Sequence, residues 1–310
     1  MGKASRLCPA TYRFEGTLTT GIILAILAAA GFGMGRVFGG IGLQGIRPMT
    51  GTVISLIFGW LLSLVVSLIF QFDALISVSP ADLGWLAIVG ILGFALGRGL
   101  TFLGIKHIGT SRSTTAYASY PLITVVLAVL FLGESAGAAL VLGILLIIGG
   151  VGFLILEREP EKRMFAGANR LLGYGFSLAA AVFYGSNSAL IKWVVTDMVH
   201  PLVTATYSLF FAMVILLAIG GRGLVPAMVK ERRSAAFFAL AGLAMTVGAM
   251  SFNGAVYLAP AVVVTPLGST SPLFTLLGTF LLMRKLETVT YHVLLGCLMV
   301  VAGGVLVTIG

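Results

Sequence analysis

Long apolar stretches follow one another along nearly the whole chain, with short polar breaks between them. Each stretch holds about 20 residues, which at about 1.5 Å per residue lets a helix cross the core of a lipid bilayer. The apolar residues run continuously instead of alternating with polar ones, so the pattern predicts helices rather than strands. We therefore expect an all-α integral membrane protein with ten transmembrane helices, at residues 18–40, 48–70, 83–105, 112–132, 137–156, 171–193, 201–220, 235–257, 261–283 and 289–309.

The longest polar break, EREPEKRMFAGANR at residues 157–170, divides these spans five and five. Its position predicts a first five-helix repeat at 18–156, a polar linker at 157–170 and a second five-helix repeat at 171–310.

The two halves can be aligned with each other by a constant shift along the sequence. Because each half has an odd number of spans, the second half must enter the membrane with opposite polarity. Such inverted repeats place a substrate site near the membrane midplane, between the halves. The aligned pairs are Gly97 with Gly248, Thr114 with Thr265 and Pro121 with Pro272 at a shift of 151 positions, then Glu134 with Glu287 and Gly143 with Gly296 at a shift of 153.

The fourth helix of each half has the same layout: a proline near its start, an apolar run and a closing glutamate, before a glycine-bearing fifth helix. The two segments read SYPLITVVLAVLFLGE (119–134) and STSPLFTLLGTFLLMRKLE (269–287). In this respect the chain resembles the EamA-type permeases of the drug/metabolite transporter superfamily, from about residue 18 to residue 310. It departs from them in the Tyr120-Pro121 pair, where Ser-Pro is usual, and in a first helix without a Trp-Gly pair. The resemblance implies secondary transport of small polar metabolites, with export the commoner direction.

Composition supports a membrane protein and excludes several other classes. Hydrophobic residues make up 59% of the chain and charged residues only 9%, against about a quarter in soluble proteins. Most of the basic residues behind the net charge of +9 lie in the gaps between spans, and no basic segment is interleaved with aromatic residues, so no nucleic-acid partner is expected. Cys8 and Cys297 lie too far apart in the sequence to indicate a disulfide framework. The first apolar stretch lacks a small-residue cleavage site and is interpreted as a span rather than a removable signal peptide.

The basic residues also predict an orientation. Positively charged loops stay in the cytoplasm, so the loops after odd-numbered spans should be cytoplasmic and both termini outside. The family resemblance implies the reverse, with both termini inside. The other side has only Lys3, Arg6, Arg13 and Lys192. The basic residues after odd-numbered spans are Arg47, Lys106, Arg112, Arg158, Lys162, Arg163, Arg170, Arg222, Lys230, Arg232, Arg233, Arg284 and Lys285.

Two arginines lie deep inside predicted spans and are the first candidates for function. Arg36 and Arg98 are each about the sixteenth residue of their span, and a charge at that depth costs roughly 2.5–3.5 kcal/mol on insertion scales. One interpretation is that both side chains extend to the lipid headgroups. The other is that they bind a substrate carboxylate, which an arginine holds with two parallel hydrogen bonds.

Polar side chains on other spans complete the predicted substrate site. The sixth span contains the cluster YGSNS at 184–188, and the fourth and ninth helices carry hydroxyl groups at helical spacing. The predicted substrate-binding residues are Arg36, Arg98, Tyr117, Tyr120, Ser186, Asn187, Asn253 and Ser271.

Other residues favour structural roles. Gly31, Gly35 and Gly39 recur every four residues and favour close helix packing. Glu134 and Glu287 each precede the fifth helix of their half, where the positive amino-terminal end of the helix dipole stabilises a carboxylate. Pro121 and Pro272 are interpreted as kinks that line a cavity.

The leading function is a secondary transporter, and probable substrates are amino or organic acids. No Asp or Glu lies deep in a span, which favours facilitated diffusion or exchange over an intramembrane proton relay. Multidrug efflux, a channel and a lipid flippase remain alternatives. No His-Glu-x-x-His, Gly-x-Ser-x-Gly or paired intramembrane aspartates are present, so we expect neither an enzyme nor a cofactor or metal site. The expected partners are a small-molecule substrate and membrane lipid, for a monomer or loose dimer in the cell (inner) membrane.

Overall fold

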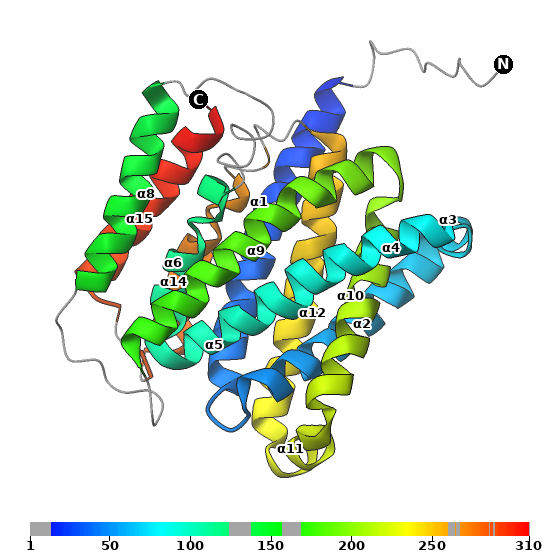
Figure 1. The fold of residues 1–310 in the computed structure, drawn as a ribbon, viewed down its shortest axis with the longest axis horizontal. Helices are drawn as coiled ribbons and strands as arrows, with labels where there is room; N and C mark the ends of the chain where they lie inside the picture. Colours follow the sequence, from blue (N-terminus) through cyan, green and yellow to red (C-terminus); the bar gives the residue numbers. More distant parts are fainter. Residues whose placement is uncertain are drawn as a thin grey trace.

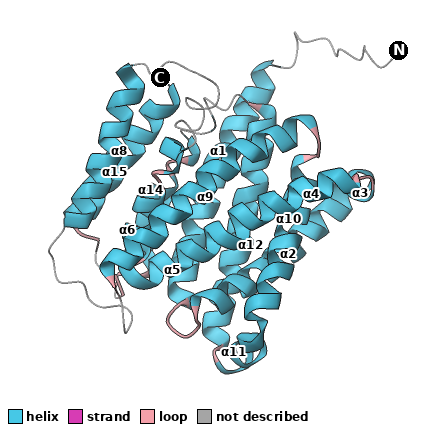
Figure 2. Cartoon of the chain, in the orientation of Figure 1, coloured by secondary structure: helices cyan, strands magenta, loops and turns pink. Residues whose placement is uncertain are grey.

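Every regular element in the described part of the chain is a helix (Figure 2). The computed structural model describes residues 14–123, 138–156, 169–259, 264, 267–284, 286, 287 and 289–309. The helices run side by side as a bundle, with α8 and α15 together at one edge (Figure 1).

The first half of the chain contains seven described helical elements and one π-helical segment within a span. In order these are α1 (Phe14–Gly42), α2 (Pro48–Phe70), the short α3 (Phe72–Ile76), α4 (Pro80–Val89), the π-helical segment Gly90–Gly97, α5 (Arg98–Ile108), α6 (Thr110–Tyr117) and α8 (Ala138–Leu156). The elements from α4 to α5 form one continuous span, Pro80–Ile108.

The second half follows the same order with a longer connection before its third span. Its elements are α9 (Arg170–Asp197), α10 (Pro201–Gly220), a 3₁₀ turn (Gly221–Gly223), α11 (Leu224–Lys230), α12 (Arg232–Leu258), α14 (Ser271–Leu282) and α15 (Tyr291–Ile309).

Six helices within the described residues are long and apolar enough to cross a membrane. These are Leu18–Gly42, Pro48–Phe70, Pro80–Ile108, Arg170–Thr196, Pro201–Ile219 and Arg232–Leu258. Val141–Leu156, Ser271–Leu282 and Tyr291–Leu306 are apolar but shorter. The chain is therefore a multi-pass membrane protein, while the count of ten spans stays a prediction because parts of 112–132 and 261–283 lie outside the described residues.

Three spans begin where the sequence supplies a proline for the first turn of a helix. Pro48, Pro80 and Pro201 occupy that turn in α2, α4 and α10, where a missing N–H removes no hydrogen bond within the helix. In front of α4, the Ser79 hydroxyl accepts from the Asp82 backbone N–H at 3.2 Å and donates to the Asp82 carboxylate at 2.7 Å. This reciprocal cap fixes the start of the third span.

The fourth and ninth helices are broken by a turn just before their prolines. The turns are at residues 118–119 and 269–270, which are 151 residues apart and so obey the register found in the sequence. Pro121 and Pro272 then lie in the first turn of the helical segment that follows. The kinks that the sequence predicts are therefore breaks, since each proline follows a turn and begins a new helical segment. Both halves instead have a discontinuous helix, and the proline is tolerated because it begins a segment.

The helix neighbours follow an approximate two-fold relation between the halves. The helix α1 packs on α12 and α14, and the helices at equivalent places, α9 against α5 and α6, pack in the same way. Helix α6, part of the fourth helix, contacts α14 of the ninth, and the equivalent helices α8 and α15 contact each other. Helix α1 begins, and α15 ends, at the same end of the bundle (Figure 1). The fourth and ninth helices are therefore in contact where the two repeats meet.

Small residues allow the closest of these helix contacts, as the sequence predicts. A Cβ atom placed on Gly31 of α1 would lie 2.7 Å from the Ala244 carbonyl oxygen and 2.8 Å from the Gly248 nitrogen of α12. Such distances leave no room for a side chain, so Gly31 is a packing glycine.

Glu287 caps a helix of the other half rather than the fifth helix of its own. Its two carboxylate oxygens accept hydrogen bonds from the backbone N–H groups of Thr110 and Ser111, each at 2.8 Å. These are the first residues of α6, which Gly109 leads into with a φ of +82°. The sequence interpretation named the wrong helix, the fifth of the second half instead of α6. Contacts between the halves depend on the tertiary fold. Glu134 lies outside the described residues.

Candidate substrate-binding cavity

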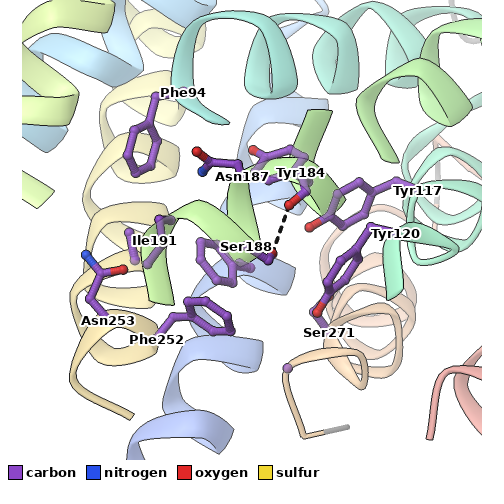
Figure 3. Close-up of a pocket in the computed structure, with 13 residues that line it drawn as sticks. Phe94, Tyr117, Tyr120, Tyr184, Asn187, Ser188, Ile191, Phe252, Asn253 and Ser271 are labelled. Atoms are coloured by element: carbon purple, nitrogen blue, oxygen red, sulfur yellow. Dashed lines mark hydrogen bonds between the residues drawn. The ribbon is translucent and has the colours of Figure 1, made fainter. Parts of the chain in front are cut away.

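The polar stretch of α9 contributes three side chains to a small internal cavity (Figure 3). Tyr184, Asn187 and Ser188 line it, whereas the predicted Ser186 does not. Along a helix, residues three and four apart share a face, so Tyr184, Asn187 and Ser188 point together while Ser186 points elsewhere. The Ser188 hydroxyl donates to the Tyr184 carbonyl oxygen at 2.8 Å, a bond to the preceding turn that leaves its helix face unchanged.

Three tyrosines form one aromatic cluster beside this stretch. The Tyr117 ring stacks on the Tyr120 ring at 5.5 Å between centroids and meets the Tyr184 ring edge-on at 4.9 Å. Tyr117 ends α6 and Tyr120 follows the turn, so the break in the fourth helix brings both rings to the cavity (Figure 3). Offset and edge-on contacts of this kind are the favourable arrangements for aromatic pairs.

Arg36 lies against the tyrosine cluster and is 1% exposed. Its guanidinium carbon is 4.3 Å from the centre of the Tyr117 ring, which places the cation over the negative face of the ring. One terminal nitrogen donates to the Ser271 hydroxyl at 3.4 Å. The Arg36 Nε–H has no hydrogen-bond partner in the described part of the chain.

Arg98 follows the π-helical segment and interacts with Tyr184. It is also 1% exposed, and its guanidinium carbon is 5.3 Å from the centre of the Phe94 ring. The Tyr184 side chain hydrogen-bonds with Arg98, and Arg36 is near enough for the two like charges to repel each other. Its Nε and Nη1 groups have no hydrogen-bond partner among the described residues. Extension of the two arginines to the lipid headgroups is therefore wrong, because both end inside the protein.

The cavity is small, with a volume of about 50 Å³. One water molecule occupies about 30 Å³ of liquid, whereas ligand pockets hold roughly 300–1,000 Å³. The cavity in this arrangement thus has room for one or two water molecules, and a metabolite needs the surrounding helices to separate.

Both repeats contribute to the lining through their first, third and fourth helices. Of the eight predicted residues, Tyr117, Tyr120, Asn187, Asn253 and Ser271 line the cavity. Arg36 and Arg98 lie directly behind that lining, in contact with Ser271, Tyr117 and Phe94. Six aromatic rings take part, those of Phe32, Phe94, Tyr117, Tyr120, Tyr184 and Phe252.

Sequence reasoning missed the three phenylalanines. In an apolar span, a phenylalanine that faces the protein interior has the same local signal as one that faces lipid. Tyr184 and Ser188 belong to the cluster that the sequence indicates, and helical spacing from Asn187 is the signal that selects them.

The two amides differ in how they are held. The Asn253 amide nitrogen donates to the Pro201 carbonyl oxygen at 3.2 Å, which ties α12 to the first turn of α10. Asn187 is 3% exposed, and its side-chain oxygen has no hydrogen-bond partner among the described residues. A buried acceptor without a partner costs roughly 1–3 kcal/mol, so Asn187 is poised to accept a hydrogen bond from a bound molecule or water.

These features define a multi-pass helical membrane protein made of two repeats that enclose a cavity between them. A family model described as the EamA-like transporter family matches residues 19–156 and 171–309. The chain belongs to this family and is a membrane transporter of the drug/metabolite transporter type. No protein of curated function matches the chain. A solved structure titled "Crystal structure of protein" is similar in fold, with a TM-score of 0.58 and 18% identity over 94% of this chain and 96% of that chain.

Proposed function

We propose that the protein is a secondary transporter of small organic anions that carry a carboxylate, such as amino or organic acids. The observation that carries this proposal is the pair of buried guanidinium groups, Arg36 and Arg98, with unpartnered N–H groups beside a cavity. Two buried cations in a low-dielectric interior are costly unless an anion compensates them. A substrate carboxylate supplies that charge and matches the planar guanidinium.

The polar groups of the lining would orient the rest of the substrate. Asn187 offers an acceptor to an ammonium or hydroxyl group, and the Tyr117 and Tyr120 hydroxyls can donate or accept. The aromatic rings favour an apolar body attached to the carboxylate.

Alternating access follows from the small size of the cavity. Because the cavity volume is only about 50 Å³, a metabolite fits only in states in which the two repeats separate on one side. We propose that export across the cell (inner) membrane proceeds by facilitated diffusion or exchange.

Counterflow in liposomes tests this proposal. A carrier loaded with unlabelled substrate accumulates labelled substrate transiently and saturates, whereas a channel does neither. Labelled carboxylates should be compared with their neutral amides. Arg36→Gln and Arg98→Gln should each raise the half-saturating concentration of the carboxylate about ten- to hundredfold, as expected for the loss of a hydrogen bond between charged groups. Lys192→Gln, which removes an exposed cation of α9, is the matched control. Unchanged affinity in both arginine variants would refute a carboxylate site.

Multidrug efflux is the second candidate, and the six aromatic rings of the lining favour it. A multidrug site would accept neutral amides and apolar cations as readily as carboxylates. The same counterflow series therefore distinguishes the two candidates, since only a carboxylate site discriminates against the amide.

A further inference from the structure

A second hollow, outside the central cavity, lies where the ends of three helices meet. It has a volume of about 470 Å³ and is formed by the end of α1, the start of α12 and the end of α14. Helix α1 packs on both α12 and α14, so these ends belong to one continuous surface. Because α1 is in the first repeat and the other two helices are in the second, the hollow bridges the repeats.

The lining of this hollow is divided into a polar rim and an apolar wall. Its polar members are Gln44, Arg233 and Arg284. Gln44 lies two residues after the end of α1, Arg233 is in the first turn of α12, and Arg284 lies two residues after the end of α14. The end of α1, the start of α12 and the end of α14 lie toward the same face of the bundle (Figure 1).

The apolar wall lies about one helical turn further into the bundle. Phe38 of α1 and Phe237 of α12 face each other, with ring centroids 6.4 Å apart. Ile41 and the last turn of α14, Leu281 and Leu282, complete most of it. Leu281 and Leu282 are 55% and 51% exposed. Their exposed apolar surface suits contact with hydrocarbon rather than water.

The charges of the rim have one sign. Arg233 and Arg284 are both exposed, and no carboxylate is among the residues that line the hollow. The Arg284 guanidinium lies over the Phe280 ring at 5.7 Å, which holds it at the edge of the wall. Basic pockets between transmembrane helices bind anionic lipid headgroups.

We propose that this hollow binds one anionic phospholipid, with its phosphate between Arg233 and Arg284 and an acyl chain along Phe38, Phe237 and Leu281. A soluble phosphate would use only the rim, whereas the apolar wall requires a hydrocarbon chain. The bound lipid contacts α1 and α14, the helices that carry Arg36 and Ser271, and thus joins the two repeats beside the cavity.

Native mass spectrometry of the detergent-solubilised protein tests the proposal. The full chain is titrated with phosphatidylglycerol, with phosphatidylcholine of the same acyl chains, and with glycerol phosphate. Wild type should bind the first phosphatidylglycerol more tightly than phosphatidylcholine. Each basic residue near an anionic lipid surface contributes about a factor of five, so Arg233→Gln with Arg284→Gln should weaken phosphatidylglycerol binding roughly 25-fold. Binding of phosphatidylcholine should stay unchanged.

The control carries the same charge change outside the hollow, as Lys230→Gln with Arg232→Gln, and should keep the preference of the wild type. Equal affinity of wild type for the two lipids would overturn the proposal without any variant. Equal loss in the control pair would show that only net charge matters. Competition by glycerol phosphate as strong as that by the lipid would show a soluble phosphate site instead.

Discussion

Tyr120 and Ser271 stand 151 residues apart, at equivalent positions of the two repeats, and both side chains line the same cavity. Tyr117 and Gly268, also 151 apart, form a second such pair in the lining. In each pair the first repeat supplies the large aromatic residue and the second supplies a small one. Arg36 lies against Tyr117 of the first repeat and donates to the small Ser271 of the second. A Cβ on Gly268 would lie 3.4 Å from the Tyr120 hydroxyl. A fold with two-fold symmetry thus encloses a site whose charge and aromatic surface come mainly from one side.

This asymmetry predicts that position 271 does not tolerate a large side chain. Ser271→Phe would fill a cavity of about 50 Å³ and displace the Arg36 guanidinium. We expect the rate of substrate counterflow to fall roughly tenfold or more, equivalent to about 1.4 kcal/mol. Leu277→Phe is the control on the same helix, because Leu277 is 56% exposed on the outer surface. Equal rates for Ser271→Phe and wild type would show that the cavity is not on the transport path.

The contact between α1 and α12 predicts a strong effect on stability at Gly31. Gly31→Leu forces a side chain against the backbone of α12, and overpacking of this kind costs about 1–3 kcal/mol. The midpoint of thermal unfolding in detergent should fall. Gly175→Leu places the same side chain in α9 where no atom lies within 4 Å of the new Cβ, and it should unfold near the wild-type temperature.

Glu287 should stabilise the start of α6. Glu287→Ala leaves the Thr110 and Ser111 N–H groups without their acceptors in a buried place, at a cost of about 1–3 kcal/mol in folding free energy. Thermal unfolding measures this loss, and Asp73→Ala, which removes an exposed carboxylate, is the comparison. An equal midpoint for Glu287→Ala and wild type would mean that water replaces the carboxylate.

The same carboxyl predicts a dependence on pH. Burial raises the pKa of Glu287 above its ordinary value of 4.5, and the backbone hydrogen bonds from Ser111 and Thr110 oppose the rise. Protonation then favours the folded state, so this contribution is present below the ordinary pKa and is lost as pH rises through the raised pKa. Glu287→Gln does not titrate. The stability of wild type relative to Glu287→Gln should therefore decline with rising pH over that interval and level off above it.

The distribution of basic residues predicts which side of the membrane holds the chain ends. The loop between α1 and α2, the start of α12 and the residues after α14 carry Arg47, Arg232, Arg233 and Arg284 at one face of the bundle. By the positive-inside rule that face is cytoplasmic, and both termini are outside. A reporter active only in the cytoplasm, fused after Gly310, should be silent. Strong activity from this fusion would support the opposite orientation, which the family resemblance implies.

The sequence by itself determined the class of protein and the division into two repeats. Continuous apolar runs leave few alternatives to membrane helices, because backbone polar groups in lipid must pair within the segment. The shift of 151 residues is also a property of the sequence, and the turns before Pro121 and Pro272 follow it. Arg36, Arg98 and Asn187 stood out because polar and charged residues are rare in apolar spans.

Only the tertiary structure decided which of these residues meet and how. Phe32, Phe94 and Phe252 face the cavity, but periodicity cannot separate an inward phenylalanine from one that faces lipid when both environments are apolar. Glu287 caps a helix some 177 residues away in sequence, and local dipole reasoning pointed to its own neighbour instead. The prolines begin helical segments because a turn precedes each one, and apolar patterning gives no sign of that turn. Contacts between the halves are made by packing, and packing is a property of the folded chain rather than of any local stretch.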